Sequence, residues 1–478
     1  MVAISNFHLG PLTREAARPQ WVRDHPRAPW AAVAAVCLAA FMGQLDASIV
    51  TLTYPRLQSE FATGLGSVAW VSLSYLVVLA VLLVPGGRWA DARGRKLLYL
   101  YGFGLFSLAS AGRALSPTLG WLVAGRGIQA VGAALLQANS VALVVLSVPR
   151  SRVRTALGFQ GAAQALGLAL GPTLGGVLVD AYGWRSVFWV NVPVGLVAIL
   201  AGHVLLPRSR DLIQARGSDG AGLVLLAGAV TSTLLALSGL SGMPLPSTWV
   251  AELCVVAIVA VVAFWRAEAR AVTPLIDVHL LRRGRLGASL AGALLAYLLL
   301  FAPLVLYPSI FAAWGMSTAA GGLVLSCLPA GFALAAVGAN VAHLRASDRQ
   351  RVAVGSVGVL AAVLANIALW RSPCLVAVLL LLMGAFLGLV IPANNAAVMA
   401  AVPASASAVT GGMVNVARAL GTALGVSITA MGLRVAYLHQ WVGPQVVLSA
   451  LAVCSVALAA TTLSWRATTG GARAGGGP

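Results

Sequence analysis

The stretch GLALGPTLGG, residues 167–176, lies inside a long apolar segment and says more about the fold than any other part of the chain. Gly167, Gly171 and Gly175 recur at every fourth position, which on a helix leaves one face free of side chains for close packing against another helix. Pro172 removes a backbone donor, a defect tolerated in lipid only where neighbouring groups satisfy the freed carbonyl. The stretch predicts a bent membrane helix with a close partner, either as a plain packing motif or as a moving part.

The composition indicates a polytopic membrane protein. Of the 478 residues, 60% are hydrophobic and 9% are charged, and the mean hydropathy is +0.92; soluble domains carry about a quarter charged residues. A membrane helix needs about 20 apolar residues. Such runs occur near 30–53, 67–86, 97–115, 119–147, 155–180, 187–206, 220–240, 248–265, 287–311, 319–342, 352–370, 374–401, 408–432 and 443–465. We therefore expect an all-α protein with 14 transmembrane helices, or twelve if 220–240 and 248–265 are not two spans.

The placement of basic residues gives an orientation. Most of the 31 Lys and Arg residues fall in the first 29 residues, after even-numbered spans or at the C-terminus, as the positive-inside rule predicts for two cytoplasmic termini. We expect a multi-pass protein of the plasma membrane. The net charge of +19 then reflects topology and not a nucleic-acid-binding surface. Five Arg residues are assigned to outer loops or span ends: Arg56, Arg113, Arg185, Arg371 and Arg434.

Motifs for enzymatic chemistry are absent from the sequence. It has no HExxH, no clustered His or Cys ligands, no Ser/His/Asp grouping and no GxxxxGK[ST] phosphate loop. We expect no metal, no cofactor and no catalytic site, and ATP is not the direct energy source. The absence of these motifs counts against a membrane-embedded enzyme or receptor.

Asp46 is the one acidic residue predicted to lie deep in a span, whereas Glu252 lies close to the outer end of its span. An intramembrane carboxylate costs several kcal/mol unless it is paired or hydrated, and is usually functional. Burial also favours the neutral form of a carboxyl group, which suits a group that loads and unloads protons. Asp46 is thus the first candidate for a proton carrier, with Glu252 a weaker second. The alternative is a structural Asp that hydrogen-bonds a neighbouring helix.

Two Arg residues, Arg126 and Arg418, are predicted inside spans. A guanidinium group stays charged and must find carbonyls, water or a carboxylate there. Arg126 lies in the glycine-rich segment LVAGRGIQAVGAALL and is expected to act on Asp46 or on a bound substrate. The alternative for both residues is a structural role in which they hold helices together.

The segment GGRWADARGRK, residues 86–96, connects the second and third spans. Asp91 is expected to pair with Arg93 or Arg95, or to face the N-terminus of a neighbouring helix, and Gly94 allows a tight turn. Such a charged clasp could hold one side of the protein closed. The alternative is an ordinary basic loop of the cytoplasmic side.

Together these segments resemble the major facilitator superfamily, and within it the fourteen-spanner drug:proton antiporters. GRWADARGRK is similar to the loop signature of the superfamily, with Trp89 and Ala92 as departures. LDASIVTLTYPRL (45–57) and RGIQAVGAALLQANS (126–140) resemble the motifs of the first and fourth helices, and GLALGPTLGG matches the antiporter motif of the fifth. WRSVFWVNVPVG (184–195), PLIDVHLLRR (274–283) and GGMVNVARALGTALGV (411–426) resemble further segments, whereas HLRASDRQR (343–351) is a degenerate second-half loop.

The resemblance implies a fold and a domain division. It implies two six-helix bundles, with two inserted helices between them in the sequence. We expect a tail at 1–29, the first bundle at 30–206, a linker with the two extra helices at 207–270, the second bundle at 271–465 and a disordered tail at 466–478.

The resemblance also implies a function, namely export of small organic molecules in exchange for protons by alternating access. The expected partners are the substrate, protons and the bilayer, and the protein is expected to be monomeric; the alternative is an importer of a small metabolite or ion. Asp46 and Arg126 are assigned to proton coupling. The gating loop comprises Gly87, Asp91, Gly94, Arg95 and Lys96, and the antiporter motif comprises Gly167, Gly171, Pro172, Gly175 and Gly176.

A binding cavity is expected near the midplane between the two bundles. Polar residues within the predicted spans are candidates to line it: Gln44, Gln129, Gln137, Asn139, Gln164, Asn394, Asn395 and Arg418. Trp70 and Tyr297 are candidates to stack on a flat ligand. The alternative for each amide is a hydrogen bond between helices, worth about 0.6 kcal/mol. Because only one deep carboxylate is predicted, dications should be poorer substrates than neutral, anionic or monocationic compounds.

Overall fold

The computed structural model describes residues 15, 17–208, 220–240, 243, 245–271, 285–341, 347–400 and 407–467. Throughout these residues the regular structure is helical and no strand is present, so the all-α prediction is confirmed. The glycine-rich tail from residue 468, the segment PLIDVHLLRR and residues 343–346 of the second-half loop lie outside the described residues, as does most of the N-terminal tail.

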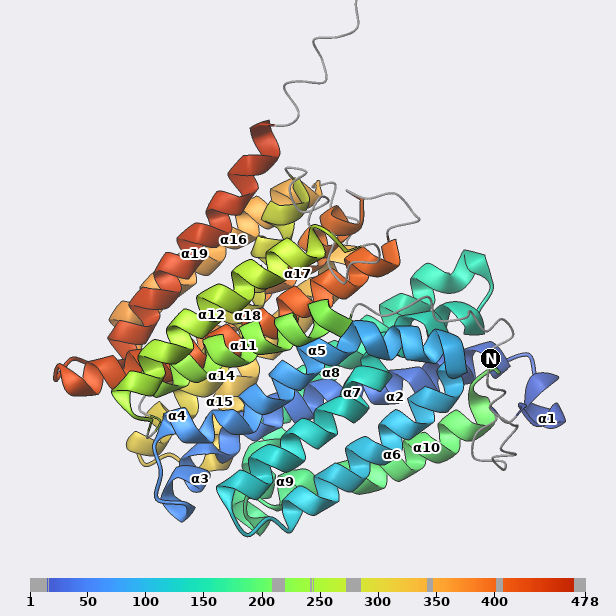
Figure 1. Ribbon diagram of the computed structural model, residues 1–478, viewed down its shortest axis with the longest axis horizontal. Coiled ribbons are helices and arrows are strands. Elements are labelled where there is room, and N and C mark those ends of the chain that lie inside the picture. The colour runs from blue at the N-terminus through green and yellow to red at the C-terminus, as the bar shows by residue number, and fades with distance from the viewer. Residues whose placement is uncertain are drawn as a thin grey trace, which may run out of the picture.

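The first half of the chain forms one group of packed helices (Figure 1). Its long helices are α2 (Ala28–Ile49), α5 (Trp70–Arg93), α6 (Arg95–Ala114), α7 (Leu119–Ser147), α8 (Val153–Tyr182) and α10 (Asn191–Leu205). Its short elements are α1 (Gln20–Arg23), η2 (Val50–Thr53), α3 (Tyr54–Glu60), α4 (Leu65–Val68), η3 (Arg150–Arg152) and α9 (Ser186–Trp189). We call it the first group.

The second group lies at the other side of the molecule and is built around α14, whose side chains form much of its apolar core. Its helices are α14 (Arg285–Ala313), α15 (Thr318–Val341), α16 (Asp348–Leu369), α17 (Pro373–Ala400), α18 (Ser407–Leu438) and α19 (Gly443–Ala467). The two groups meet chiefly where α8 packs on α15 and α5 packs on α18.

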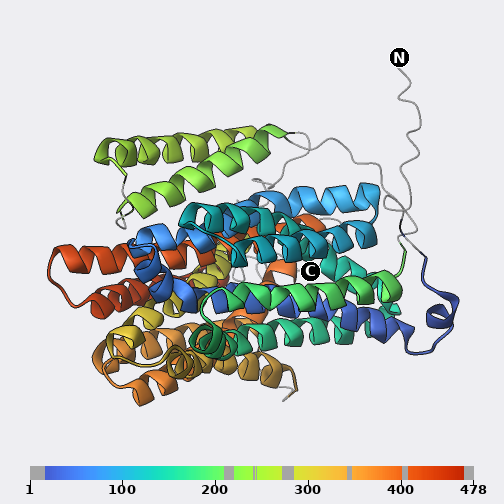
Figure 2. The ribbon, with the colours of Figure 1, turned by 90° about the horizontal axis from the view of Figure 1, so that it is seen from below.

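Between the groups in sequence comes the hairpin of α11 (Gly220–Leu240) and α12 (Ser247–Glu268). Figure 2 shows it along one side of the bundle. Helix α11 packs on α5 and α18, one helix from each group, whereas α12 packs mainly on α11. The hairpin is therefore peripheral, and its two helices are separate, so the alternative of twelve spans does not hold.

In the described part of the chain, 13 helices are long and apolar enough to cross a membrane. Helix α6 falls outside that criterion because Arg95, Lys96 and Arg113 lie within it together with several Gly, Ser and Tyr residues. It nevertheless packs along α7 and α10 inside the first group. It corresponds to the predicted span at 97–115 and crosses the bundle with the others.

Helix α8 uses its glycines for close contacts on two sides. Gly167, Gly171 and Gly175 all face α2, and a methyl group on Gly175 would lie 2.6 Å from Ile49 Cγ1. Gly176 faces α15 instead, where a methyl group would lie 2.8 Å from Ala319 Cα. The predicted side-chain-free face is confirmed, and α8 continues through Pro172. The glycines thus allow α8 to pack tightly on both groups at once.

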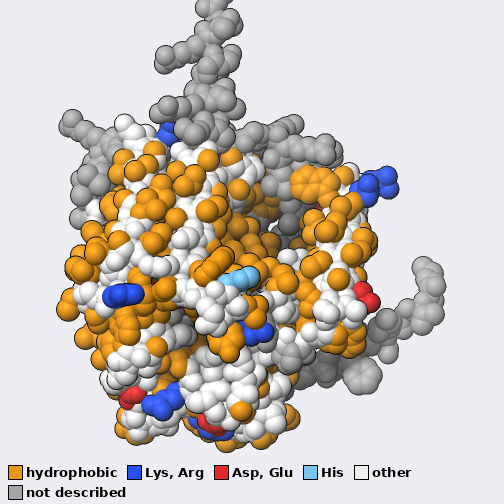
Figure 3. Space-filling view, turned by 90° about the vertical axis from the view of Figure 1, so that its left-hand side faces the viewer, with side chains coloured by type: hydrophobic (Ala, Val, Ile, Leu, Met, Phe, Trp, Pro, Cys, Tyr) orange, Lys and Arg blue, Asp and Glu red, His pale blue; other side chains and the backbone are white. Residues whose placement is uncertain are grey.

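The bundle has two ends, which we name after a residue at each. The Asp180 end includes Glu60 and the first turn of α15, and lies at the left of Figure 1 with α3 and α4. Its surface is largely uncharged, with isolated Lys, Arg, Asp and Glu side chains (Figure 3). The opposite Gly94 end holds the turn between α5 and α6 and the basic η3 segment, Arg150–Arg152.

Candidate functional site

Asp46 lies on α2 in the middle of the first group and has an exposed fraction of 0%. Arg126 Nη1 on α7 donates to its Oδ2. Its Oδ1 accepts hydrogen bonds from Gln129 Nε2 at 3.2 Å, also on α7, and from Asn191 Nδ2 at 2.8 Å on α10. The buried carboxylate is therefore fully hydrogen-bonded by side chains from neighbouring helices.

Arg126 links this carboxylate to α5. Its Nε donates to the carbonyl oxygen of Val71 at 3.0 Å, and its guanidinium carbon lies 4.4 Å from the centroid of the Tyr75 ring. Its Nη1 also contacts Gln129 Oε1 at 2.6 Å. The expected contact between Asp46 and Arg126 is therefore present, and it joins α2, α5 and α7.

Arg113 is a second cation at the same carboxylate. It lies in the last turn of α6, at the span end where the sequence placed it, but it has an exposed fraction of 0% and points into the bundle. Its Nη2 lies 3.4 Å from Asp46 Oδ1 and 3.1 Å from Ser110 Oγ, and its guanidinium lies over the Phe188 ring at 4.2 Å. The sequence did not predict its burial, in which contacts with the carboxylate, a hydroxyl and a ring face replace water around the charge.

Charge is unbalanced in this network, which holds two guanidinium groups and one carboxylate. An isolated buried charge is strongly destabilising, and a buried pair offsets that cost only through close geometry. Asp46 is thus the counter-charge for both Arg113 and Arg126. Loss of its negative charge would leave two buried guanidinium groups with no carboxylate partner among the described residues.

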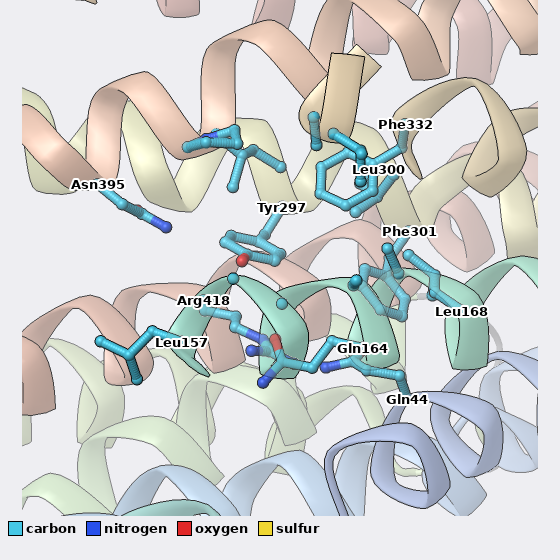
Figure 4. A pocket seen from close by; sticks show the side chains of 18 residues that line it. Gln44, Leu157, Gln164, Leu168, Tyr297, Leu300, Phe301, Phe332, Asn395 and Arg418 are labelled. Carbon is cyan, nitrogen blue, oxygen red and sulfur yellow. The ribbon is translucent and has the colours of Figure 1, made fainter. Parts of the chain in front are cut away.

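A cavity of about 300 Å³ lies between the two groups. Figure 4 shows Gln44, Gln164 and Arg418 along one side of it, with Tyr297 and Phe332 opposite. Two smaller cavities lie beside it. Gln44 and Arg418 line the large cavity and both smaller ones. The expected cavity at the interface is present in the described part of the chain.

Six of the residues proposed for the cavity line at least one of these spaces: Gln44, Gln137, Gln164, Tyr297, Asn395 and Arg418. Three of the proposed amides line none of them. Gln129 belongs to the Asp46 network, Asn139 donates to the Leu135 carbonyl oxygen at 2.7 Å, and Asn394 donates to the Ser289 carbonyl oxygen at 2.8 Å. Gln129 and Asn394 thus form the hydrogen bonds between helices that were the alternative for these amides, whereas Asn139 bonds within its own helix, α7. Trp70 also lies outside the three linings and packs against an apolar cluster to which both groups and α11 contribute.

One side chain connects the cavity with the carboxylate network. Tyr75 lines a cavity beside Gln44 and Arg418, and its ring also contacts the guanidinium of Arg126. Gln44 lies two residues before Asp46 on α2. Movement of α2 or α5 at the cavity would therefore be transmitted to the carboxylate.

The groups are in contact with each other at the Asp180 end. Asp180 on α8 accepts hydrogen bonds from the backbone amides of Thr318 at 3.3 Å and Ala319 at 2.7 Å, at the start of α15. Farther along the same two helices, the hydroxyl groups of Thr173 and Ser326 lie 2.7 Å apart. The large cavity instead extends past Leu157 and Val337, toward the Gly94 end.

Comparison with known proteins places this architecture in a family. Residues 36–426 match the family model of the Major Facilitator Superfamily. The chain belongs to the major facilitator superfamily. It is a multi-pass membrane transporter and not an enzyme, and the resemblance of its motifs to this family is confirmed.

Relatives and solved structures agree with this assignment. The transporter is 31% identical over 407 residues to the multidrug resistance protein Stp of Mycobacterium tuberculosis, covering 82% of this chain and 73% of that one. It is 30% identical over 403 residues to the methylenomycin A resistance protein of Bacillus subtilis, covering 82% and 85%. A crystal structure of the peptide transporter POT with sulfate has a TM-score of 0.65 at 15% identity, covering 93% and 96%, and shows a common fold.

The loop signature of the transporter lies at the Gly94 end. Most of the expected loop is helical, because α5 continues to Arg93, and the turn narrows to Gly94, whose φ of 112° is a conformation that favours glycine. Asp91 and Arg95 form an ion pair of 2.7 Å, one of the two pairings predicted. Gly87 lies on the last turns of α5, where a methyl group would be 3.8 Å from Ala138 Cβ.

Lys96 and Glu15 complete this corner of the transporter. Lys96 Nζ donates to the carbonyl oxygen of His203 on α10 at 2.7 Å, and the Glu15 carboxylate accepts from the backbone amide of Lys96 at 2.9 Å. Glu15 thus caps the start of α6, an end where backbone donors lack helical partners. All of these contacts lie within the first half of the chain, so a clasp between the two groups stays a prediction.

Proposed function

We propose that the transporter exports small organic molecules in exchange for protons. The observation that carries the proposal is the position of Asp46: a buried carboxylate holds α2, α6, α7 and α10 together, one side chain away from a cavity between the two groups. Intramembrane carboxylates of this kind mark proton relays in transporters. A change in the charge of Asp46 would alter the packing of the helices that line the cavity.

Basic side chains at the Gly94 end support a cytoplasmic location for that end. In this orientation the large cavity extends toward the cytoplasm, and the contacts of Asp180 with α15 close the outer side. The conformation is then the state that takes up a substrate from the cytoplasm. Export also accords with the names of two relatives, a multidrug resistance protein and an antibiotic resistance protein.

Charge balance ties protonation to movement. In this conformation Asp46 compensates Arg113 and Arg126, so a proton on Asp46 would leave two buried cations without their counter-charge. Proton uptake therefore belongs to another conformation, in which the helices carrying these residues have separated and water reaches the side chains. Asp46 takes a proton from the outside after substrate release and returns it to the cytoplasm as the present network reforms.

Resistance of a pump-deficient, drug-hypersensitive bacterium tests this proposal. The wild type should confer resistance to members of a broad panel of antibiotics and dyes, and Asp46→Asn should abolish it at an equal amount of folded protein in the membrane. The second candidate, Glu252, is exposed on the peripheral helix α12 and not buried in a charge network, so Glu252→Gln, which also converts a carboxylate into an amide, should leave resistance unchanged and is the matched control. Resistance that survives Asp46→Asn would contradict the coupling role, and accumulation of the compounds in cells would contradict export.

A further inference from the structure

Arg418 is the charged residue of the cavities. It lines all three spaces, and every other residue that lines them is apolar or uncharged. The linings of these described cavities therefore contain a permanent positive charge and no Asp or Glu. Arg cannot lose its proton under physiological conditions, so the charge persists throughout the transport cycle.

Within the described part of the chain, Arg418 forms no ion pair. Its guanidinium carbon lies 5.3 Å from the centroid of the Tyr297 ring, which offers a cation–π contact but no counter-charge. The buried carboxylate of Asp46 is already shared by Arg113 and Arg126. Neither the Asp46 network nor the linings of the three cavities supply a carboxylate that could pair with Arg418.

A cation without a counter-charge in a cavity bounded by protein attracts an anion, because the protein around it screens charge less than water does. We infer that the cavity selects small aromatic organic anions, with Arg418 as the group that recognises their carboxylate or phenolate. This inference rests on the proposed function and names the substrate class of the same cavity. It also explains why dications should be rejected, since they would meet Arg418 with no carboxylate beside it.

The remaining lining fits the rest of such a ligand. The aromatic rings of Tyr297, Phe301 and Phe332 offer flat apolar surfaces, and the amides of Gln164 and Asn395 offer hydrogen-bond donors and acceptors (Figure 4). A volume of about 300 Å³ is at the lower end of the range for small-molecule pockets. A ligand of two to three fused rings with one acidic group would satisfy both the ring surfaces and Arg418.

Direct binding tests this inference without any gradient. The purified transporter in lipid nanodiscs is titrated with three matched fluorescent probes: anthracene-2-carboxylate, anthracene-2-carboxamide and 2-(aminomethyl)anthracene, which are anionic, neutral and cationic at pH 7.5. The carboxylate should bind about tenfold or more tightly than the amide, as a charge-assisted hydrogen bond would provide. The cation should bind most weakly.

Variants identify the recognising group. Arg418→Gln should weaken binding of the carboxylate about tenfold while the affinity for the amide changes less than about twofold. Arg418→Lys should restore part of the preference, and Arg371→Gln, which removes an Arg from the Asp180 end, should change neither affinity. Unchanged carboxylate binding in Arg418→Gln, or tightest binding of the cation, would overturn the inference.

The two proposals fail in different ways. If resistance is found but binding shows no preference for the anion, export stands and the substrate class is wrong. If the anion binds through Arg418 but no compound is exported, the recognition site stands and the proposed direction or coupling is wrong. The binding measurement depends on neither protons nor Asp46.

Discussion

Arg113 Nη2 lies 3.4 Å from Asp46 Oδ1, so a second guanidinium shares the carboxylate that pairs with Arg126. All three side chains are buried. The network therefore carries one positive charge more than it can neutralise, and this surplus determines how its members respond to substitution.

Charge balance predicts an order of stability. Asp46→Asn should lower the free energy of unfolding by about 3–5 kcal/mol, because two buried cations lose their partner. Arg113→Met should cost far less, since Asp46 and Arg126 remain as a pair. The double variant, Asp46→Asn with Arg113→Met, should recover part of the loss. Thermal unfolding of each purified protein in one detergent measures the order.

Arg126→Met is the control for this order of stability. It removes the other guanidinium of the network, whose Nε also donates to the carbonyl oxygen of Val71. It should be more destabilising than Arg113→Met. If Arg113→Met were as damaging as Asp46→Asn, the surplus-charge description would be wrong, and Arg113 would instead act mainly through its contacts with Ser110 and Phe188.

Close packing of α8 on α2 gives a second prediction. Gly175→Ala should destabilise the transporter by about 1–3 kcal/mol, because the added methyl group would lie 2.6 Å from Ile49 Cγ1 and force the helices apart. Gly104→Ala on α6 is the control, since no atom lies within 4 Å of its added methyl group. Thermal unfolding should distinguish them, and equal melting temperatures would show that the helices separate without cost.

Closure at the Asp180 end gives a third prediction. Thr173→Cys combined with Ser326→Cys should form a disulfide on mild oxidation, because the two native hydroxyl groups are 2.7 Å apart. The cross-link should stop transport by preventing the outer side from opening, and a reductant should restore it. The experiment uses a background without the native cysteines, with each single variant as a control. Full transport by the cross-linked protein would show that this contact does not have to open.

Hydropathy predicted most of the fold because membrane helices must bury their backbone groups in apolar runs. Helix α7 begins and ends where its apolar run does, at Leu119 and Ser147. Helix α6 is the instructive case, since Lys96 and Arg113 lower its hydropathy although both are buried by contacts with other helices. Such contacts join residues far apart in sequence, and a window of neighbouring residues contains no information about them.

The same reason limits prediction of the site. Asp46 and Arg126 could be paired because few other charges lay inside spans. The contact of Arg113 with Asp46 could not be predicted, because an Arg side chain at a span end usually extends to the membrane surface. Asn394 and Asn395 are adjacent, yet only Asn395 lines the cavity, since consecutive helical residues point in different directions. The rotation of α17 about its axis decides between them, and it is set by packing.

Proton-driven transport in proteoliposomes shows whether Asp46 couples substrate movement to protons. An exported compound from the resistance panel is loaded outside vesicles that contain the purified wild type or Asp46→Asn, and its accumulation is followed after a pH gradient is imposed. Counterflow exchange without a gradient shows that each protein is folded and binds the compound. We expect Asp46→Asn to keep counterflow but to lose gradient-driven accumulation. Accumulation that persists in Asp46→Asn would contradict the assignment of proton coupling to this carboxylate.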